Sequence, residues 1–254
     1  MKRDVLFFWI PKNAGTSIYK VLKEYDCPKL KHLYLSKTFD NSGYVTFSHI
    51  SINYLLERNI ISKKYFNDAY KFCFVRNPWD RLVSIYHYRN YDENITFSEF
   101  IHLIQKKFQL QQSFLGKLSQ NFYNTLFFMS DGPSPITGKL TEISKKIDTL
   151  PSRDFLILPL PRVGPYNVLG LSQANPQSDW IYDKNGNLMV DFIGKVENLN
   201  EDIDKVFEII GINGKIPHLN KTKRKKYKKY YTEETKKIVE GLYKKDIENF
   251  GYTF

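Results

Sequence analysis

The chain has 254 residues, of which 42% are hydrophobic and two are cysteines, and its formal net charge is +11 at pH 7. This length and apolar content exclude an unfolded chain and favour one α/β domain over residues 1–254. Two cysteines exclude a disulfide framework, and no apolar run is as long as a membrane span or a secretory signal, so we expect a cytoplasmic protein without a membrane span.

The first part of the chain predicts two strand-loop-helix units. Residues 5–10 form an apolar run typical of a buried strand, and after a turn at 11–15 the apolar residues recur at helical spacing as far as Tyr25. The same pattern starts again at Tyr70, with a break at Pro78 before the second helix. Two such units indicate a parallel sheet.

Between these units the sequence predicts a short strand and a helix. The strand covers residues 44–47 and places His49 at its end, and the helix covers residues 52–57. Further along, residues 96–126 are expected to be mainly helical. Prolines and glycines are concentrated at 130–186, which predicts loops close to the substrate.

The last part of the chain continues the alternation of strand and helix. Residues 188–193 predict a strand, and residues 199–210 predict a helix that ends at Gly211. A final amphipathic helix is expected from Thr232 to beyond Ile247. The fold class expected for the whole chain is therefore α/β, with a central parallel sheet flanked by helices.

The turn after the first strand has the composition of an anion-binding loop. Where a strand ends and a helix begins, free backbone N–H groups and the positive helix end face one small volume. Gly15 permits close approach of the backbone, and Lys12 supplies a point charge. The segment is not a Walker A loop, because Lys12 precedes its only glycine, and taken alone it also fits a turn with a Thr or Ser helix cap. The residues predicted to bind the anion are Lys12, Asn13, Ala14, Gly15, Thr16 and Ser17.

A second candidate anion site follows the strand that begins at Tyr70. Arg76 lies at the end of this strand, and Ser84 lies two turns into the next helix, so a guanidinium and a hydroxyl are available to hold a terminal phosphate. The simpler interpretation is that Arg76 caps the strand and Ser84 faces water. Two anion sites on neighbouring strand ends suit one ligand with a phosphosulfate and a separate phosphate.

These two motifs resemble those of the sulfotransferases that use 3′-phosphoadenosine-5′-phosphosulfate (PAPS), particularly the carbohydrate O-sulfotransferases of the heparan sulfate 2-O and chondroitin type. Residues 10–17 are similar to the family's 5′-phosphosulfate loop and residues 75–84 to its 3′-phosphate motif. Residues 191–199 and 243–254 are similar to its late strand-to-helix segment and to its C-terminal ending. The resemblance implies a P-loop-like sulfotransferase fold. The family's eukaryotic members typically carry a membrane anchor, so a bacterial or viral version is expected.

The resemblance also implies roles for single residues. PAPS is the implied co-substrate, with no metal, and Arg76 and Ser84 hold its 3′-phosphate. Transfer to a hydroxyl, expected to belong to a carbohydrate, needs positive charge on the leaving oxygen, for which Lys12 is the candidate. The general base is expected to be His49, because the 2-O-sulfotransferase-like branch uses a histidine after this strand. Other branches use a glutamate, which makes Glu57 the alternative base.

Two other functions remain open from the sequence. A nucleotide kinase or another phosphate-binding α/β enzyme would use the same strand-loop-helix site. The basic segment at 221–229, which follows His218, could instead bind a nucleic acid, close over the nucleotide or act as a solvated loop. On the sulfotransferase interpretation no nucleic-acid partner is expected.

Overall fold

The computed structural model describes residues 4–31, 43–57, 59–88, 91–112, 173–216 and 224–254. They divide into two compact units. The first unit combines Met1–Asn77 with Gln177–Lys223, and the second combines Pro78–Pro176 with Arg224–Phe254. The predicted single domain over residues 1–254 remains a prediction.

The first unit is built on a five-stranded sheet with the strand order β2-β3-β1-β4-β5. Each neighbouring pair of strands is parallel, which confirms the predicted α/β class with a central parallel sheet. The strands are β1 Val5–Trp9, β2 Lys29–Lys31, β3 Tyr44–Ser48, β4 Tyr70–Val75 and β5 Phe192–Lys195.

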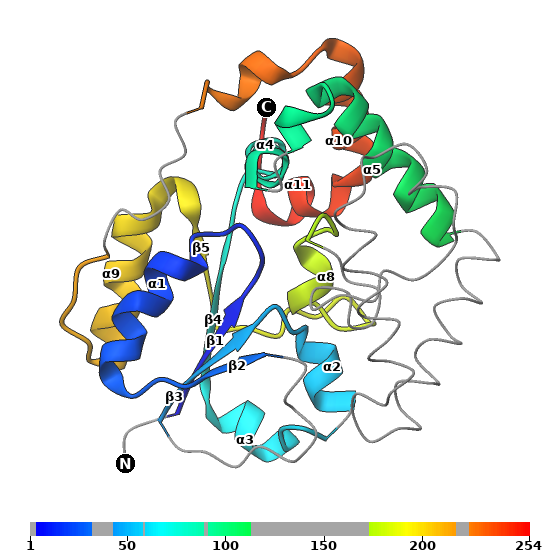
Figure 1. Ribbon diagram of the computed structural model, residues 1–254. Helices are drawn as coiled ribbons and strands as arrows, with labels where there is room; N and C mark the ends of the chain where they lie inside the picture. Colours follow the sequence, from blue (N-terminus) through cyan, green and yellow to red (C-terminus); the bar gives the residue numbers. More distant parts are fainter. Residues whose placement is uncertain (1–3, 32–42, 58, 89–90, 113–172, 217–223) are drawn as a thin grey trace, which may run out of the picture. The chain divides into compact units, whose positions relative to one another are not determined.

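Side chains that alternate along the strands build a core on both faces of the sheet. On one face, Val5 and Phe7 of β1 join a buried cluster with α1 and α9, which lie side by side in Figure 1. On the other face, Phe8 stacks on Phe47 with ring centroids 5.5 Å apart and meets the ring of Phe66 edge-on. The helices of this unit are α1 Gly15–Leu22, α2 Ile52–Glu57, α3 Lys63–Asp68, α8 Ser178–Ile181 and α9 Leu199–Ile210.

The predicted strand at 188–193 is wrong in its position. Leu188 makes only an isolated antiparallel bridge with Tyr182, and β5 begins at Phe192. The reason lies in Asp191, whose carboxylate accepts a hydrogen bond from the backbone N–H of Lys71 at 2.7 Å and forms an ion pair with the buried Lys71 ammonium at 3.1 Å. The edge of β4 therefore fixes where pairing with β5 starts. The sequence also failed to predict β2 and α3.

The second unit is helical in the part of the chain that the structure describes. It contains α4 Pro78–Tyr88, α5 Phe97–Gln112, α10 Glu233–Leu242 and α11 Lys244–Phe250. The single final helix predicted from Thr232 is therefore two helices, while the prediction for 96–126 is confirmed as far as Gln112 and otherwise lies outside the described residues. None of the helices in the described ranges is long and apolar enough to cross a bilayer.

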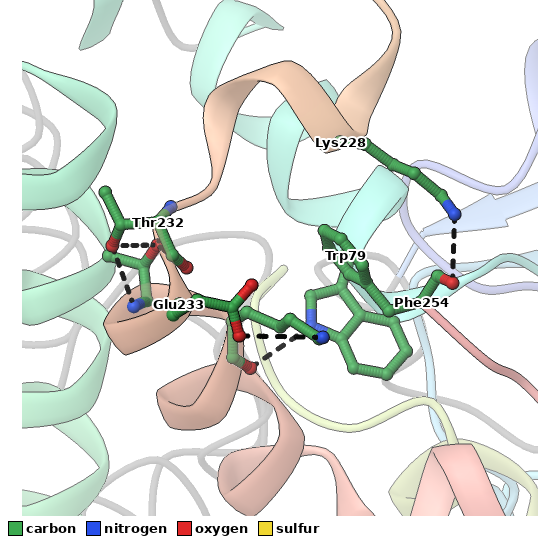
Figure 2. A network of polar contacts seen from close by, with 7 residues as sticks. Trp79, Lys228, Thr232, Glu233 and Phe254 are labelled. Atoms are coloured by element: carbon green, nitrogen blue, oxygen red, sulfur yellow. Dashed lines mark hydrogen bonds and ion pairs between the residues drawn. The ribbon is translucent and has the colours of Figure 1, made fainter.

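The first turn of α4 is held by residues near the end of the chain. The Nε1–H of Trp79 donates to the carbonyl of Lys236 at 3.3 Å, and the Trp79 ring meets Phe254 edge-on at 5.5 Å (Figure 2). Thr232 begins α10 with a capping box in which its side chain and that of Thr235 each accept from the other residue's backbone N–H. These contacts fix α4 and α10 against each other within the second unit.

Candidate functional site

The order of the strands places the candidate site at the carboxyl ends of β1, β3 and β4. Trp9 at the end of β1 pairs with Ser48 of β3, and Phe8 pairs with Cys73 of β4. After β1 the chain continues to β2 and β3 on one side, and it then crosses to β4 on the other side. The connections therefore diverge between β1 and β4, which is where open parallel sheets bind their ligands.

The loop after β1 is held in an unusual backbone conformation. Lys12 and Ala14 have φ angles of 69° and 58°, a left-handed region that costs a residue other than glycine about 1–3 kcal/mol. The amides of Ser17 and Ile18 both donate to the carbonyl of Ala14, so α1 starts without a side-chain cap. The alternative of a Thr or Ser cap is therefore wrong. The amides of Gly15 and Thr16 precede the first hydrogen bond of the helix, as an anion-binding helix end requires.

The need for glycine at position 15 comes from Trp9. A Cβ atom on Gly15 would lie 2.0 Å from the Trp9 indole Nε1, closer than any real contact. The indole is also fixed by the ring of Tyr19 at 6.2 Å and by the Lys29 ammonium at 5.4 Å. Burial raises the pKa of the Tyr19 phenol, and Cys27 contributes less to the same shift. Gly15 thus allows the loop to pack directly on the end of β1.

The Arg76 side chain turns from the end of β4 toward the loop after β1. Its Nη1 donates to the carbonyl of Lys12 at 3.3 Å. The Arg76 guanidinium therefore lies beside the Lys12 loop within the first unit. Thr16 is exposed on this loop, whereas the Ser17 side chain is buried.

His49 directly follows β3, as the sequence predicts. Its backbone N–H donates to the carbonyl of Trp9 at 3.1 Å, and its half-buried ring meets the Trp9 indole edge-on at 5.4 Å. The φ angle of His49 is 63°. Five described non-glycine residues have a positive φ, and three of them are Lys12, Ala14 and His49 at the ends of β1 and β3. Backbone strain of this kind gathers at functional sites and is maintained by the packing around it. Glu57, the alternative base, forms an ion pair with Lys184 at 2.7 Å.

Comparison with known proteins identifies the family of this site. A model of the sulfotransferase family matches residues 2–127 and 172–253, more than half of the chain. The chain belongs to the sulfotransferase family. An uncharacterized protein of Archaeoglobus fulgidus is 45% identical over 47 residues, which are 17% of this chain and 39% of that protein. The chain thus covers well under two thirds of this relative. No solved structure matches the chain.

The rest of the second motif belongs to the second unit. Ser84 is half-buried on α4, and its prediction as a phosphate ligand is not tested by its place there. The guanidinium of Arg81 is buried and donates to the carbonyls of Gln173 and Asn175 at 2.6 and 2.8 Å. Arg81 therefore braces residues 173–175. Within the described ranges, no three His, Cys, Asp or Glu side chains form a group that could hold a metal ion.

The basic segment at 221–229 also lies partly in this unit. Residues 217–223, with His218, lie outside the described residues. Arg224 forms an ion pair with Asp80 of α4 at 2.7 Å, and the Lys228 ammonium donates to the main-chain oxygen of Phe254 at 3.0 Å, as Figure 2 shows. Two members of the basic segment, Arg224 and Lys228, therefore have structural partners.

Sequence reasoning missed two residues that hold the loop after β4. Gln177 accepts a hydrogen bond from the N–H of Arg76 at 2.9 Å, and Glu197 accepts one from the N–H of Asn77 at 2.7 Å. Glu197 lies in a segment that the sequence compared with the family, but no local pattern distinguishes Gln177. Its role depends on contacts with residues about a hundred positions earlier in the chain.

Proposed function

We propose that this sulfotransferase moves a sulfuryl group from PAPS to a hydroxyl, with a carbohydrate as the acceptor class. One observation carries the proposal, namely the contact between the Arg76 guanidinium and the Lys12 carbonyl at the ends of adjacent strands. PAPS carries its 5′-phosphosulfate and its 3′-phosphate on the same ribose. The Lys12 loop and the adjacent Arg76 guanidinium can therefore bind the two groups of one nucleotide.

Sulfuryl transfer requires that the negative charge on the leaving oxygen be stabilised and that the acceptor hydroxyl lose its proton. The acceptor oxygen forms a bond to sulfur, and the bond between sulfur and the bridging oxygen breaks, so that the electron pair leaves with adenosine 3′,5′-bisphosphate. Lys12 stabilises the negative charge on that leaving oxygen together with the amides at the start of α1. His49 takes the proton from the acceptor hydroxyl. Arg76 and Ser84 hold the 3′-phosphate, which is remote from the reacting bond and supplies binding energy for alignment.

Several features support these roles. Lys12, Ala14 and His49 are strained at two neighbouring strand ends, as catalytic positions often are. The carbohydrate acceptor follows from the resemblance of residues 10–17 and 75–84 to the carbohydrate O-sulfotransferases. That resemblance is weak at residues 95–185, where residues that recognise an acceptor are expected.

Calorimetric titration with adenosine 3′,5′-bisphosphate tests the proposal. The wild-type protein should bind it with micromolar or better affinity, and Arg76→Ala should weaken binding about 10–100-fold, the value of one or two charged hydrogen bonds. Arg76→Lys should recover only part of the loss, because an ammonium lacks the planar fork that grips a phosphate.

The matched control removes a charge elsewhere in the same unit. Lys64 is exposed on α3 and pairs with Asp68 at 3.0 Å, so Lys64→Ala should leave the affinity unchanged. ATP should compete poorly with the bisphosphate. Equal affinity for ATP and the bisphosphate would contradict the proposal and favour a kinase.

A further inference from the structure

A single buried glutamine connects the two anion-binding loops. The side chain of Gln177 is fully buried, and its Oε1 accepts from the Nδ2 of Asn13 at 2.7 Å and from the N–H of Arg76 at 2.9 Å. Its Nε2 donates to the carbonyl of Arg76 at 2.8 Å. One carboxamide thus makes three hydrogen bonds, two to the peptide groups of Arg76 and one to the loop after β1.

The partners define the orientation of this carboxamide. Two donors face its oxygen and one acceptor faces its nitrogen, so a rotated amide would place like groups against each other at each contact. The paired bonds to the N–H and carbonyl of Arg76 resemble those between adjacent strands and prevent rotation of that residue about its own backbone. Gln177 therefore sets the direction in which the Arg76 side chain leaves β4.

The same network fixes the loop after β1. Asn13 is buried, and its Nδ2 donates both to Gln177 and to the carbonyl of Phe74 in β4 at 2.7 Å. The Oδ1 of Asn13 has no hydrogen-bond partner among the described residues, so its two donated bonds alone hold this side chain. Because both side chains are buried, the loss of one of these bonds costs more than the loss of an exposed one.

We infer that Gln177 is a positioning residue that sets the spacing between the Lys12 loop and the Arg76 guanidinium, and thereby allows both to bind one nucleotide with two phosphate groups. This inference rests on the proposed function. It makes a specific claim about binding: Gln177 acts on the simultaneous binding of the 3′- and 5′-phosphates and has little effect on a nucleotide that has only one of them.

Two nucleotides and two variants test this role. The affinities for adenosine 3′,5′-bisphosphate and for 5′-AMP, which lacks the 3′-phosphate, are measured by calorimetry on Gln177→Leu, with folding checked by urea denaturation. Binding of the bisphosphate should weaken about tenfold or more, whereas binding of 5′-AMP should change by less than about threefold. In an Arg76→Ala background, Gln177→Leu should have little further effect.

The variant Gln177→Glu gives a second readout that structural loss alone would not produce. An ionised carboxylate places an oxygen against the Arg76 carbonyl, but a protonated carboxyl can donate to it and restore all three bonds. The affinity of this variant for the bisphosphate, relative to wild type at each pH, should therefore recover as the pH falls from about 8 to about 5.5, because burial favours the neutral acid. This experiment also decides the question if Gln177→Leu does not fold.

A matched control removes a hydrogen bond at the other end of α8. Asn53 donates to the carbonyl of Tyr182 at 2.9 Å, so Asn53→Leu should leave both affinities unchanged. If wild type binds the bisphosphate and folded Gln177→Leu binds it equally well, or loses affinity for both nucleotides alike, the positioning role is refuted. A Gln177→Glu affinity that does not depend on pH would also refute it. If wild type itself does not bind the bisphosphate, the proposed function fails instead.

Discussion

Replacement of Gly15 by alanine tests whether the loop after β1 is packed on Trp9 as the structure indicates. The added Cβ would lie 2.0, 2.2 and 2.3 Å from the Nε1, Cδ1 and Cε2 atoms of the indole. Carbon contacts are comfortable at about 3.5 Å, so the ring would have to move by about 1.5 Å. Tyr19, at a ring distance of 6.2 Å, and His49, at 5.4 Å, limit that movement.

The size of the effect follows from two opposing contributions. Overpacking typically lowers the free energy of unfolding by about 1–3 kcal/mol, while the change from glycine to alanine in a helix raises it by about 0.5–1 kcal/mol. We therefore expect Gly15→Ala to destabilise the protein by up to about 2.5 kcal/mol, or to lower Tm by up to about 10 °C. The control is Gly241→Ala in α10, where a Cβ meets no atom within 4 Å, and which should stabilise slightly.

Urea denaturation of the single and double variants provides the measurement. In a Trp9→Leu background the indole is absent, so Gly15→Ala should lose its cost and become neutral or stabilising. The two substitutions should therefore couple by about 1 kcal/mol or more. A Gly15→Ala protein as stable as the Gly241→Ala control, or a cost that persists in the Trp9→Leu background, would refute the proposed packing.

Three further predictions concern single side chains. Lys12→Ala should lower kcat for sulfate transfer from PAPS about 100–1000-fold and affect bisphosphate affinity much less, and a loss confined to affinity would assign Lys12 to binding alone. His49→Asn, which tolerates the positive φ angle, should keep bisphosphate affinity and lose about 100-fold or more of the transfer of labelled sulfate; unchanged turnover would remove His49 from the mechanism. Burial raises the pKa of the Cys27 thiol to about 11. The neutral thiol therefore stabilises the fold fully below about pH 8, and this stabilisation decreases by on the order of 2 kcal/mol as the pH rises to 11. Cys27→Ser, which keeps a hydroxyl near Thr46, should flatten the decrease in urea midpoint between pH 7.5 and 10, and an equal slope in both proteins would contradict this.

The sequence by itself determined the elements whose patterns are local. Val5–Trp9 is a continuous apolar run, and Tyr70–Val75 is apolar apart from Lys71, because both faces of these strands are covered. Leu199–Ile210 has an apolar stripe that ends at a glycine with φ of 72°. Lys12 and Arg76 could be selected because each lies within three residues of the end of a buried strand. Such signals depend only on burial and on neighbours within a few turns.

Only the tertiary structure decided how these parts meet. The start of β5 depends on the bonds of Asp191 to Lys71, and the requirement for Gly15 depends on the place of the Trp9 ring. Gln177 lies 101 positions after Arg76 and 164 after Asn13, so no local periodicity marks it as their shared partner. The residues of the candidate site can be recognised from sequence because chemistry selects their types, whereas their spacing is set by buried hydrogen bonds that exist only after distant segments of the chain have packed together.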